Sequence, residues 1–197
     1  MARELFSFRF AEILLPRFFI YVIIKNMGVL EVIKKRRSIR KFKPDPISEE
    51  VIDKLIEAII WAPSAGNRQM RKFFFVFNND LKKKIALASL YQTFIEEAPL
   101  VIVACGDKGI ERYYGKRGLE NYLFCDVAAS IQNLLLVAEE ENLGACWVGA
   151  FDEEKIKKIL NLPESLIPIA IIPVGYPQKI PPPPPRKDKN SLIEIIK

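Results

Sequence analysis

Apolar positions recur along the chain at two spacings, which predict helices and strands in alternation. Apolar residues three and four positions apart are typical of a helix with one buried face, whereas a short continuous apolar run is typical of a buried strand. Ser48 and Asp152 are suited to cap helix N termini, and Gly144 is predicted to end the longest helix. Helices are predicted over residues 29–37, 48–62, 80–90 and 126–142 and after residue 152, and strands over residues 73–77, 100–105, 145–150 and 167–174.

The first 26 residues do not follow this pattern. They are strongly apolar, but Pro16 and Arg17 interrupt them, and no stretch approaches the ~20 residues needed to span a bilayer. No small-residue cleavage site follows, which argues against a secretory signal. Three interpretations stay open: a start codon wrongly placed upstream of Met27, an arm packed on a partner subunit, or a monotopic membrane anchor. The domain itself is expected over residues 27–197.

The C-terminal tail is also distinctive. Five consecutive prolines, Pro181 to Pro185, predict an extended segment. Residues 192–196 form a strand-like apolar run with no partner nearby in the sequence. Such a strand requires the edge of a sheet elsewhere.

Length and composition indicate one globular domain. The 197 residues, half of them hydrophobic, are enough to bury a sizeable core. The net charge of +6 would suit nucleic acid or anionic lipid, but Lys and Glu alternate in segments such as residues 153–158, as on a solvated helix face. A nucleic-acid partner is therefore not expected. Abundant Lys, Glu and Ile are typical of heat-adapted proteins.

The reactive side chains exclude several chemistries. Cys105, Cys125 and Cys146 are widely spaced in apolar segments, which argues for a reducing cytoplasm and against disulfides or a zinc site. The chain has no histidine, so a Ser-His-Asp triad and His-ligated metals are excluded. We expect no metal and no catalytic side chain. A bound cofactor that brings its own reactivity is the simplest source of catalysis.

The segment Arg36-Arg37-Ser38-Ile39-Arg40 is the strongest binding signal. Three guanidinium groups, each a planar fork of donors that stays charged, make a compact receptor for an anion such as phosphate. The ordinary alternative is a solvated basic face.

Further motifs follow the basic segment in a fixed order. With it, they resemble the FMN-dependent nitroreductase family over about residues 27–197. The segments that carry the resemblance are WAPSAGNRQ at residues 61–69, QTFIEEAP at 92–99, GACWVGAF at 144–151, and PVGYP at 173–177, which leads to Arg186 and Lys187. The resemblance implies an α+β fold with a central, mostly antiparallel sheet flanked by helices. It also implies an intertwined homodimer in which the C-terminal segment crosses to the other subunit.

The resemblance assigns most FMN contacts to one subunit. Gln92 is expected at the ring edge, and the backbone N–H groups of Gly149 and Ala150 are expected near N5 and O4. On residues alone, Gln92 could equally be a surface group and Gly149 a turn at a strand end. The phosphate and part of the ring edge are assigned to Arg36, Arg37, Ser38 and Arg40, with Arg186 as a late phosphate contact and Lys187 as its nearest substitute.

The resemblance assigns the remaining contacts to the partner subunit and to a variable cover. Pro63, Ser64 and Asn67 are expected to reach the FMN bound mainly by the other subunit. Taken alone, their loop is an ordinary turn after a helix. Tyr113 and Tyr114, in the short cover over residues 108–122, are expected to stack on the acceptor, and surface packing is the alternative.

The function implied by the resemblance is ping-pong hydride transfer. NADH or NADPH would reduce FMN at N5, and a nitroaromatic, quinone or flavin acceptor would then take the hydride at the same place. Two alternatives stay open: a flavoenzyme with the same scaffold and other chemistry, such as dehalogenation or flavin fragmentation, and a non-catalytic protein that binds phosphate or nucleic acid through its basic segment.

Overall fold

The computed structural model describes residues 28–197, so the expectations for residues 1–26 lie outside the described part. Helices alternate with strands, as predicted. The helices are α2 (Val29–Lys35), α3 (Glu49–Ile60), α4 (Asn79–Ala88), α5 (Phe94–Glu97), α6 (Glu111–Arg117), α7 (Leu123–Glu140) and α8 (Glu153–Leu160). The strands are β1 (Arg71–Val76), β2 (Leu100–Asp107), β3 (Gly144–Ala145) and β4 (Leu166–Gly175). Single turns occur at Ala65–Asn67, Lys108–Ile110, Gly118–Tyr122 and Lys189–Ser191.

The strands form one sheet in the order β1-β2-β4-β3, and every neighbouring pair is antiparallel. This confirms the expected α+β class. Successive side chains of β2 point to opposite faces, so Leu100 and Ile102 face one helical layer and Val101 and Val103 face the other. Because both faces are covered, β2 is apolar at nearly every position.

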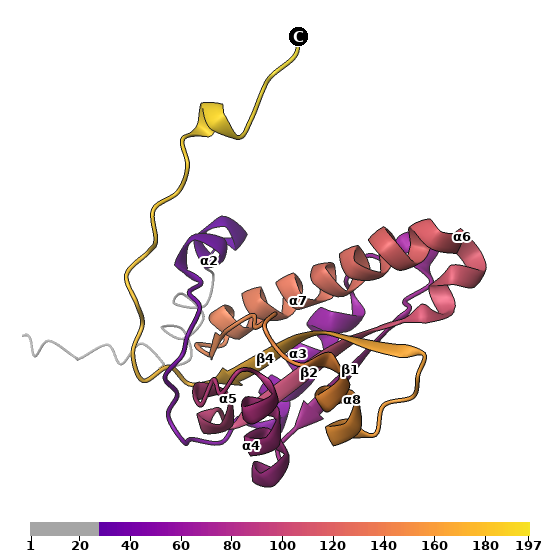
Figure 1. Cartoon of the computed structure of the whole chain (residues 1–197). Helices are drawn as coiled ribbons and strands as arrows, with labels where there is room; N and C mark the ends of the chain where they lie inside the picture. Colours follow the sequence, from indigo (N-terminus) through magenta and orange to yellow (C-terminus); the bar gives the residue numbers. More distant parts are fainter. Residues whose placement is uncertain (1–27) are drawn as a thin grey trace, which may run out of the picture.

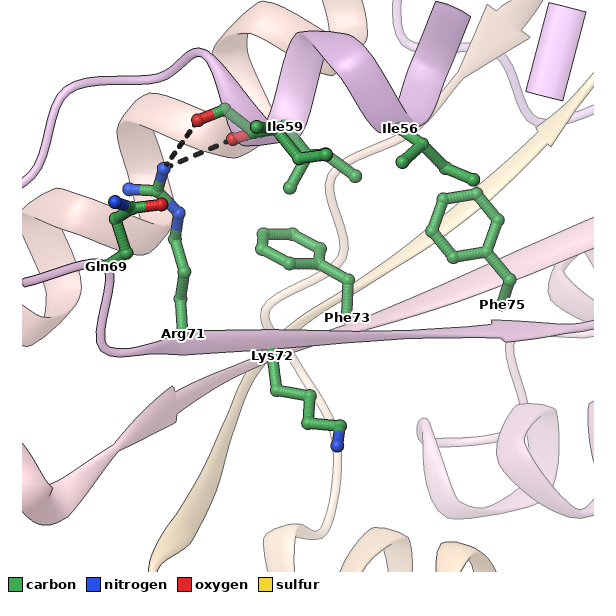
Figure 2. Close-up of a pocket in the computed structure, with 8 residues that line it drawn as sticks. Ile56, Ile59, Gln69, Arg71, Lys72, Phe73 and Phe75 are labelled. Atoms are coloured by element: carbon green, nitrogen blue, oxygen red, sulfur yellow. Dashed lines mark hydrogen bonds between the residues drawn. The ribbon is translucent and has the colours of Figure 1, made fainter. Parts of the chain in front are cut away.

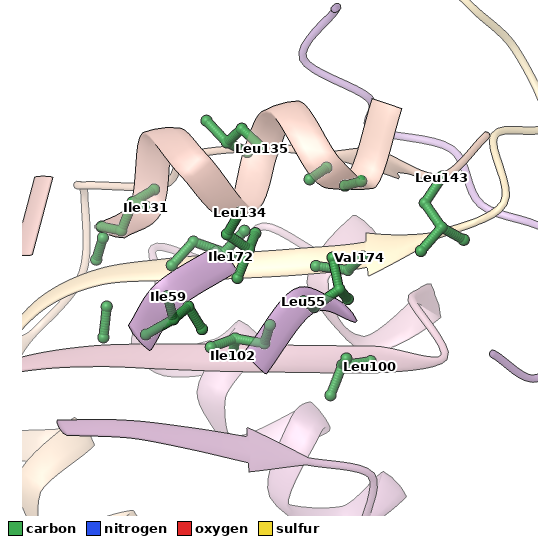
Figure 3. Packing of buried hydrophobic residues seen from close by; sticks show 14 of the residues in the cluster. Leu55, Ile59, Leu100, Ile102, Ile131, Leu134, Leu135, Leu143, Ile172 and Val174 are labelled. Atoms are coloured by element: carbon green, nitrogen blue, oxygen red, sulfur yellow. The ribbon is translucent and has the colours of Figure 1, made fainter. Parts of the chain in front are cut away.

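Helices α3 and α7 cover one face of the sheet (Figures 1 and 3). Leu55 and Ile59 of α3 and Ile131 and Leu134 of α7 pack on Ile172 of β4, and all are buried. The α7 side chains recur at helical spacing along one face, which is why the sequence pattern of this helix is strong. Within residues 28–197, only the helical stretch Lys108–Glu140 is long and apolar enough to span a membrane, and packing of α7 on the sheet accounts for that apolar character.

Helices α4, α5 and α8 cover the other face (Figure 1). Ile85, Ile95 and Ile156, one from each helix, are fully buried. The protein is therefore a three-layer structure, with the sheet between two layers of helices.

The predicted helix caps at Ser48 and Asp152 are confirmed. The Ser48 hydroxyl accepts a hydrogen bond from the Val51 N–H, and the Asp152 carboxylate accepts one from the Lys155 N–H. Both are local signals, in which a side chain satisfies an N–H of the first helical turn.

Two expectations around residue 144 were wrong. Gly144 does not end α7, because the chain leaves the helix two residues earlier through Asn142, which takes a left-handed φ of 60°. Gly144 lies in β3, where a Cβ would overlap the side chain of Ile39. The strand predicted over residues 145–150 shrinks to Gly144–Ala145 and one bridge between Val148 and Ile171, because the regular pairing with β4 is interrupted after Ala145.

The C-terminal tail leaves the body of the protein. Figure 1 shows it passing beside α2 and then running outward. Within the described chain, residues 192–196 form no strand, and the apolar side chains of this run are exposed. The crossing to a second subunit stays a prediction.

Candidate functional site

Four arginines predicted to hold phosphate line one pocket. Its volume is about 370 Å3. Arg186 arrives from the proline-rich tail, some 150 positions from the basic segment in the sequence, and Lys187 does not line the pocket. Among residues 28–197, no carboxylate lies within ion-pair distance of these arginines. The pocket lining comprises Arg36, Arg37, Ser38, Arg40, Pro181, Pro182, Pro184 and Arg186.

The local fold holds the basic segment against the sheet. α2 ends at Lys35, earlier than predicted, and Ser38 pairs with Ala145 in a parallel bridge, with the Ile39 N–H 3.0 Å from the Ala145 carbonyl. Arg37 donates to the carbonyls of three preceding residues at 2.7 to 2.9 Å, so its guanidinium closes the end of α2.

The arginines of this segment interact with Cys146 and Phe94. Burial raises the pKa of Cys146, and the positive charges of Arg40 and Arg36 oppose that rise. The Arg40 guanidinium also lies 5.9 Å from the centre of the Phe94 ring, which fixes its stem on an apolar surface.

Gln92 and Ala150 are in contact, and Phe94, two residues after Gln92, lies against Arg40 of this segment. The Gln92 amide donates to the Ala150 carbonyl at 3.2 Å and to the Ser89 carbonyl at 2.8 Å. Gly149 is exposed, and a Cβ placed on it would meet no atom within 4 Å. This backbone is therefore open to a ligand. We call Gln92, Gly149 and Ala150, with Arg36, Arg37, Ser38, Arg40 and Arg186, the basic group.

The other predicted residues gather around the loop after α3. Gly66 packs so closely on the Tyr114 hydroxyl that a Cβ there would overlap it. The Arg68 guanidinium lies 4.0 Å from the centre of the Tyr113 ring. We call Pro63, Ser64, Asn67, Tyr113 and Tyr114 the loop group.

The two groups lie at opposite ends of α7. Ala65 of the loop is hydrogen-bonded to Asp126 near the start of α7, whereas Ser38 pairs with Ala145 beyond its end. The 18 residues of this helix span about 27 Å. Figure 1 shows α6 and α2 at its two ends. One chain therefore brings each group together but does not join the two.

Sequence reasoning missed two residues beside the loop group, Asp126 and Arg71. Asp126 is 5% exposed and accepts a hydrogen bond from the Ala65 N–H, and Arg71 donates to four carbonyls at the end of α3. A carboxylate beside Val127 and Ile131 in a strongly apolar helix was the available signal for Asp126.

Solved structures define the class of this fold. The chain matches a crystal structure from Parabacteroides distasonis, provisionally named NADH dehydrogenase/NAD(P)H nitroreductase, with a TM-score of 0.76 and 33% identity over 86% of this chain and 98% of that one. It also matches nitroreductase A of Vibrio parahaemolyticus with a TM-score of 0.80 over 87% of this chain and 77% of that one, and at 23% identity this likeness concerns the fold alone. The architecture is that of a nitroreductase.

Sequence comparison shows the family. The model of the Nitroreductase family matches residues 33–91 and 83–176. A Methanothermobacter thermautotrophicus protein, provisionally named NADH dehydrogenase/NAD(P)H nitroreductase, is 35% identical over 162 residues, which are 80% of this chain and 82% of that protein. The chain thus belongs to the nitroreductase family and is an oxidoreductase. The FMN reductase [NAD(P)H] of Bacillus subtilis is 28% identical over 163 residues, 76% of this chain and 66% of that protein.

Proposed function

We propose that the protein is a homodimeric, FMN-dependent oxidoreductase that takes hydride from NADH or NADPH and gives it to a small acceptor such as a nitroaromatic, a quinone or a flavin. The observation that carries the proposal is the pocket lined by Arg36, Arg40 and Arg186, where no carboxylate among the described residues lies within 4.0 Å of a guanidinium nitrogen. Unpaired guanidinium groups around one cavity favour a phosphate ligand. The names of the B. subtilis FMN reductase and of the NAD(P)H nitroreductase relatives support the same cofactors.

The described residues fit FMN in charge and in space. The arginines and Ser38 would bind the phosphate, and the open backbone at Gly149 and Ala150 leaves room for a flat ring. Gln92, which donates to the Ala150 carbonyl, would hold this stretch in place. FMN, when bound, supplies hydride transfer at N5, so that donor and acceptor are served in turn at one place.

The protein itself would bind, orient and shield the reactants. Backbone N–H groups at residues 149–150 would stabilise negative charge on the reduced ring without a titratable side chain. Tyr113 and Tyr114 would stack on the acceptor. No residue is assigned a proton transfer, because solvent can supply protons.

A second copy of the chain would complete the site. The basic group and the loop group lie at opposite ends of α7, so two chains packed with α7 in opposite directions bring one basic group to the other chain's loop group, twice over. Pro63 and Asn67 are exposed and available for such a contact. This arrangement would explain why one chain contains both groups but not a joined site.

The C-terminal tail would hold the dimer together. Within residues 28–197, β1 has no strand on its outer edge, and an apolar trough of about 390 Å3 lies between β1 and α3. Figure 2 shows Phe73 and Phe75 pointing from β1 toward α3 in this trough. The exposed apolar run at residues 192–196 of a second chain has the composition to cover such an edge.

We place the protein in the cytoplasm, where a reducing environment suits the three free cysteines, Cys105, Cys125 and Cys146. An absorbance spectrum of the purified protein, followed by anaerobic addition of NADH or NADPH, tests the proposed function. Flavin bands that bleach with either nucleotide are expected. A colourless protein that takes up no added FMN would overturn the proposal and favour a phosphate-binding or nucleic-acid-binding role for the basic group.

A further inference from the structure

Asp126 is a carboxyl group on the buried face of α7. Its side chain lies in the first turn of α7, between the apolar sheet and the loop after α3. One carboxylate oxygen accepts a hydrogen bond of 2.9 Å from the Ala65 N–H, and the other has no hydrogen-bond partner among the described residues. A buried carboxylate that satisfies only one of its two oxygens costs stability. Its presence therefore calls for a reason other than packing.

Arg71 binds carbonyl groups at the start of the same loop. Its guanidinium donates to the carbonyls of Ala62 at 2.8 Å and Pro63 at 3.1 Å. It also donates to the carbonyls of Ile59 and Ile60, the last two residues of α3, and Figure 2 shows these two bonds. The side chain thereby satisfies carbonyl groups that the helix end leaves without partners.

Both anchors bind backbone atoms and leave the loop side chains free. Asp126 takes the N–H of Ala65, and Arg71 takes carbonyls up to Pro63. Pro63 and Asn67, predicted to contact the cofactor, remain exposed. The loop is thus fixed from below while its outer surface stays available.

The loop adopts a backbone that would not persist without support. Gly66, Asn67 and Gln69 all have positive φ values, between 52° and 54°. Each non-glycine residue in this region costs on the order of 1 kcal/mol, and such strain survives only where surrounding contacts dictate it. The Ser64 hydroxyl, which accepts from the Gln69 N–H at 3.1 Å, adds one contact within the loop.

The charges of the two anchors also act on each other. Burial raises the pKa of Asp126, while the Ala65 N–H and the positive charge of Arg71 oppose that rise. Burial lowers the pKa of Arg71, and Asp126 opposes that change. No ion pair within 4.0 Å joins them among the described residues, and the hydrogen bonds of both side chains go to backbone atoms of residues 59–65.

We infer that Asp126 is a positioning residue, which with Arg71 fixes the loop over residues 63–69 in the shape that lets it reach the cofactor bound by the other subunit. The role in cofactor binding rests on the proposed function, whereas the fixing of the loop does not depend on it. Asp126 acts through the Ala65 N–H and touches no reacting atom.

Hydrogen exchange tests the fixing of the loop without reference to flavin. Asp126→Leu removes the acceptor with a side chain of similar size, and Asp126→Asn keeps one carbonyl oxygen for the Ala65 N–H. Ser130→Ala is the matched control, because it removes a buried hydrogen bond of the same helix, to the Asp126 carbonyl, and leaves the loop untouched. Amide exchange of residues 64–69 should be about ten-fold faster or more in Asp126→Leu and near the wild-type rate in Asp126→Asn and Ser130→Ala.

Flavin titration and steady-state kinetics test the link to function in the same variants. In Asp126→Leu, the FMN dissociation constant should rise about ten-fold, while the melting temperature and the dimer mass stay near those of the wild type. Asp126→Asn should restore FMN affinity and kcat. If Asp126 served only to stabilise the fold, FMN affinity and kcat would instead change together with the melting temperature. Asp126→Ala, which leaves a small cavity, replaces the Leu variant if that variant does not fold.

Each outcome decides between the claims. Unchanged exchange of residues 64–69 in Asp126→Leu, or equal acceleration in Ser130→Ala, would overturn the fixing of the loop. Faster exchange with unaltered FMN affinity and kinetics would overturn its role in the site. A wild-type protein without flavin would sink the proposed function, and the exchange experiment would still decide whether Asp126 fixes the loop.

Discussion

The basic group and the loop group are built in opposite ways. The basic group relies on charged side chains from an extended segment and a proline-rich tail, with few hydrogen bonds among them. The loop group relies on backbone shape, held by one buried carboxylate and one guanidinium that contact no other part of the proposed site. The basic group depends on the types of its side chains, whereas the loop group depends on the backbone conformation of a short segment and on the side chains that fix it.

Removing charge from the basic group should have the largest effect. A charge-assisted phosphate contact is worth roughly 1.5 to 3 kcal/mol, so Arg36→Ala with Arg40→Ala should weaken FMN binding by about a hundred-fold or more. Fluorescence titration of apoprotein with FMN measures this. Lys83→Ala, which removes an exposed charge from α4, is the control and should bind as wild type. Full flavin occupancy in the double variant would show that the basic group does not bind the phosphate.

In the proposed dimer, the tail of one chain covers the outer edge of β1 in the other chain. Charges placed on the tail should therefore weaken the dimer and separate the basic group of one chain from the loop group of the other. Ile193→Glu with Ile195→Glu puts two carboxylates on one side of the strand-like run and should raise the dimer dissociation constant about ten- to a hundred-fold. Sedimentation at several concentrations measures it. Glu194→Gln, between the two, serves as control. A dimer that resists the double change would place the interface elsewhere.

Substitution of one glycine at each group should change the free energy of unfolding by different amounts. Gly66→Ala forces a Cβ into the Tyr114 hydroxyl at a φ of +52° and should lower the free energy of unfolding by about 1 to 2 kcal/mol. Gly149→Ala, in the basic group, meets no atom within 4 Å and should change it by less than about 0.5 kcal/mol. Urea unfolding of both variants gives the comparison. Equal losses would mean that the loop is no more constrained than the open backbone.

The smallest expected effect concerns pH. The pKa of Asp126 is raised by burial, so the folded protein holds this proton more tightly than the unfolded chain does. The stability gained from the proton is complete below the ordinary value of 3.8 and is lost as pH rises through the raised pKa. The Asn side chain does not titrate, so Asp126→Asn does not lose this stability. The melting temperature of Asp126→Asn minus that of the wild type should therefore increase by a few degrees from acid to neutral pH. A constant difference would argue that Asp126 titrates normally.

The sequence could predict features that depend on side-chain type or on contacts within one helical turn. Ser48 and Asp152 were placed correctly as helix caps, because the signal and its effect lie within one turn. The basic residues were chosen by side-chain type, and the structure brings Arg186 to them across the length of the chain. Their role with FMN stays a prediction.

Where the reasoning failed, tertiary contacts decided the outcome. Gly144 looked like a helix end, but it is needed where Ile39 packs against β3. The apolar run over residues 145–150 does not form a continuous strand, since β3 pairs with β4 over two residues and only Val148 bridges β4 beyond them. Asp126 could not be assigned a role, because its partner, Ala65, lies 61 residues earlier in the chain. No spacing rule reports such a contact.

The position of β4 in the sheet has a consequence for synthesis. It is the last strand in the sequence, yet it lies between β2 and β3 and makes the longest ladder, with β2. A nascent chain that ends before Leu166 therefore has β1 to pair with β2 and no strand for the other edge of β2. Chains stalled on the ribosome at this stage should expose β2 and depend on chaperones, whereas release of the last residues lets the sheet close at once.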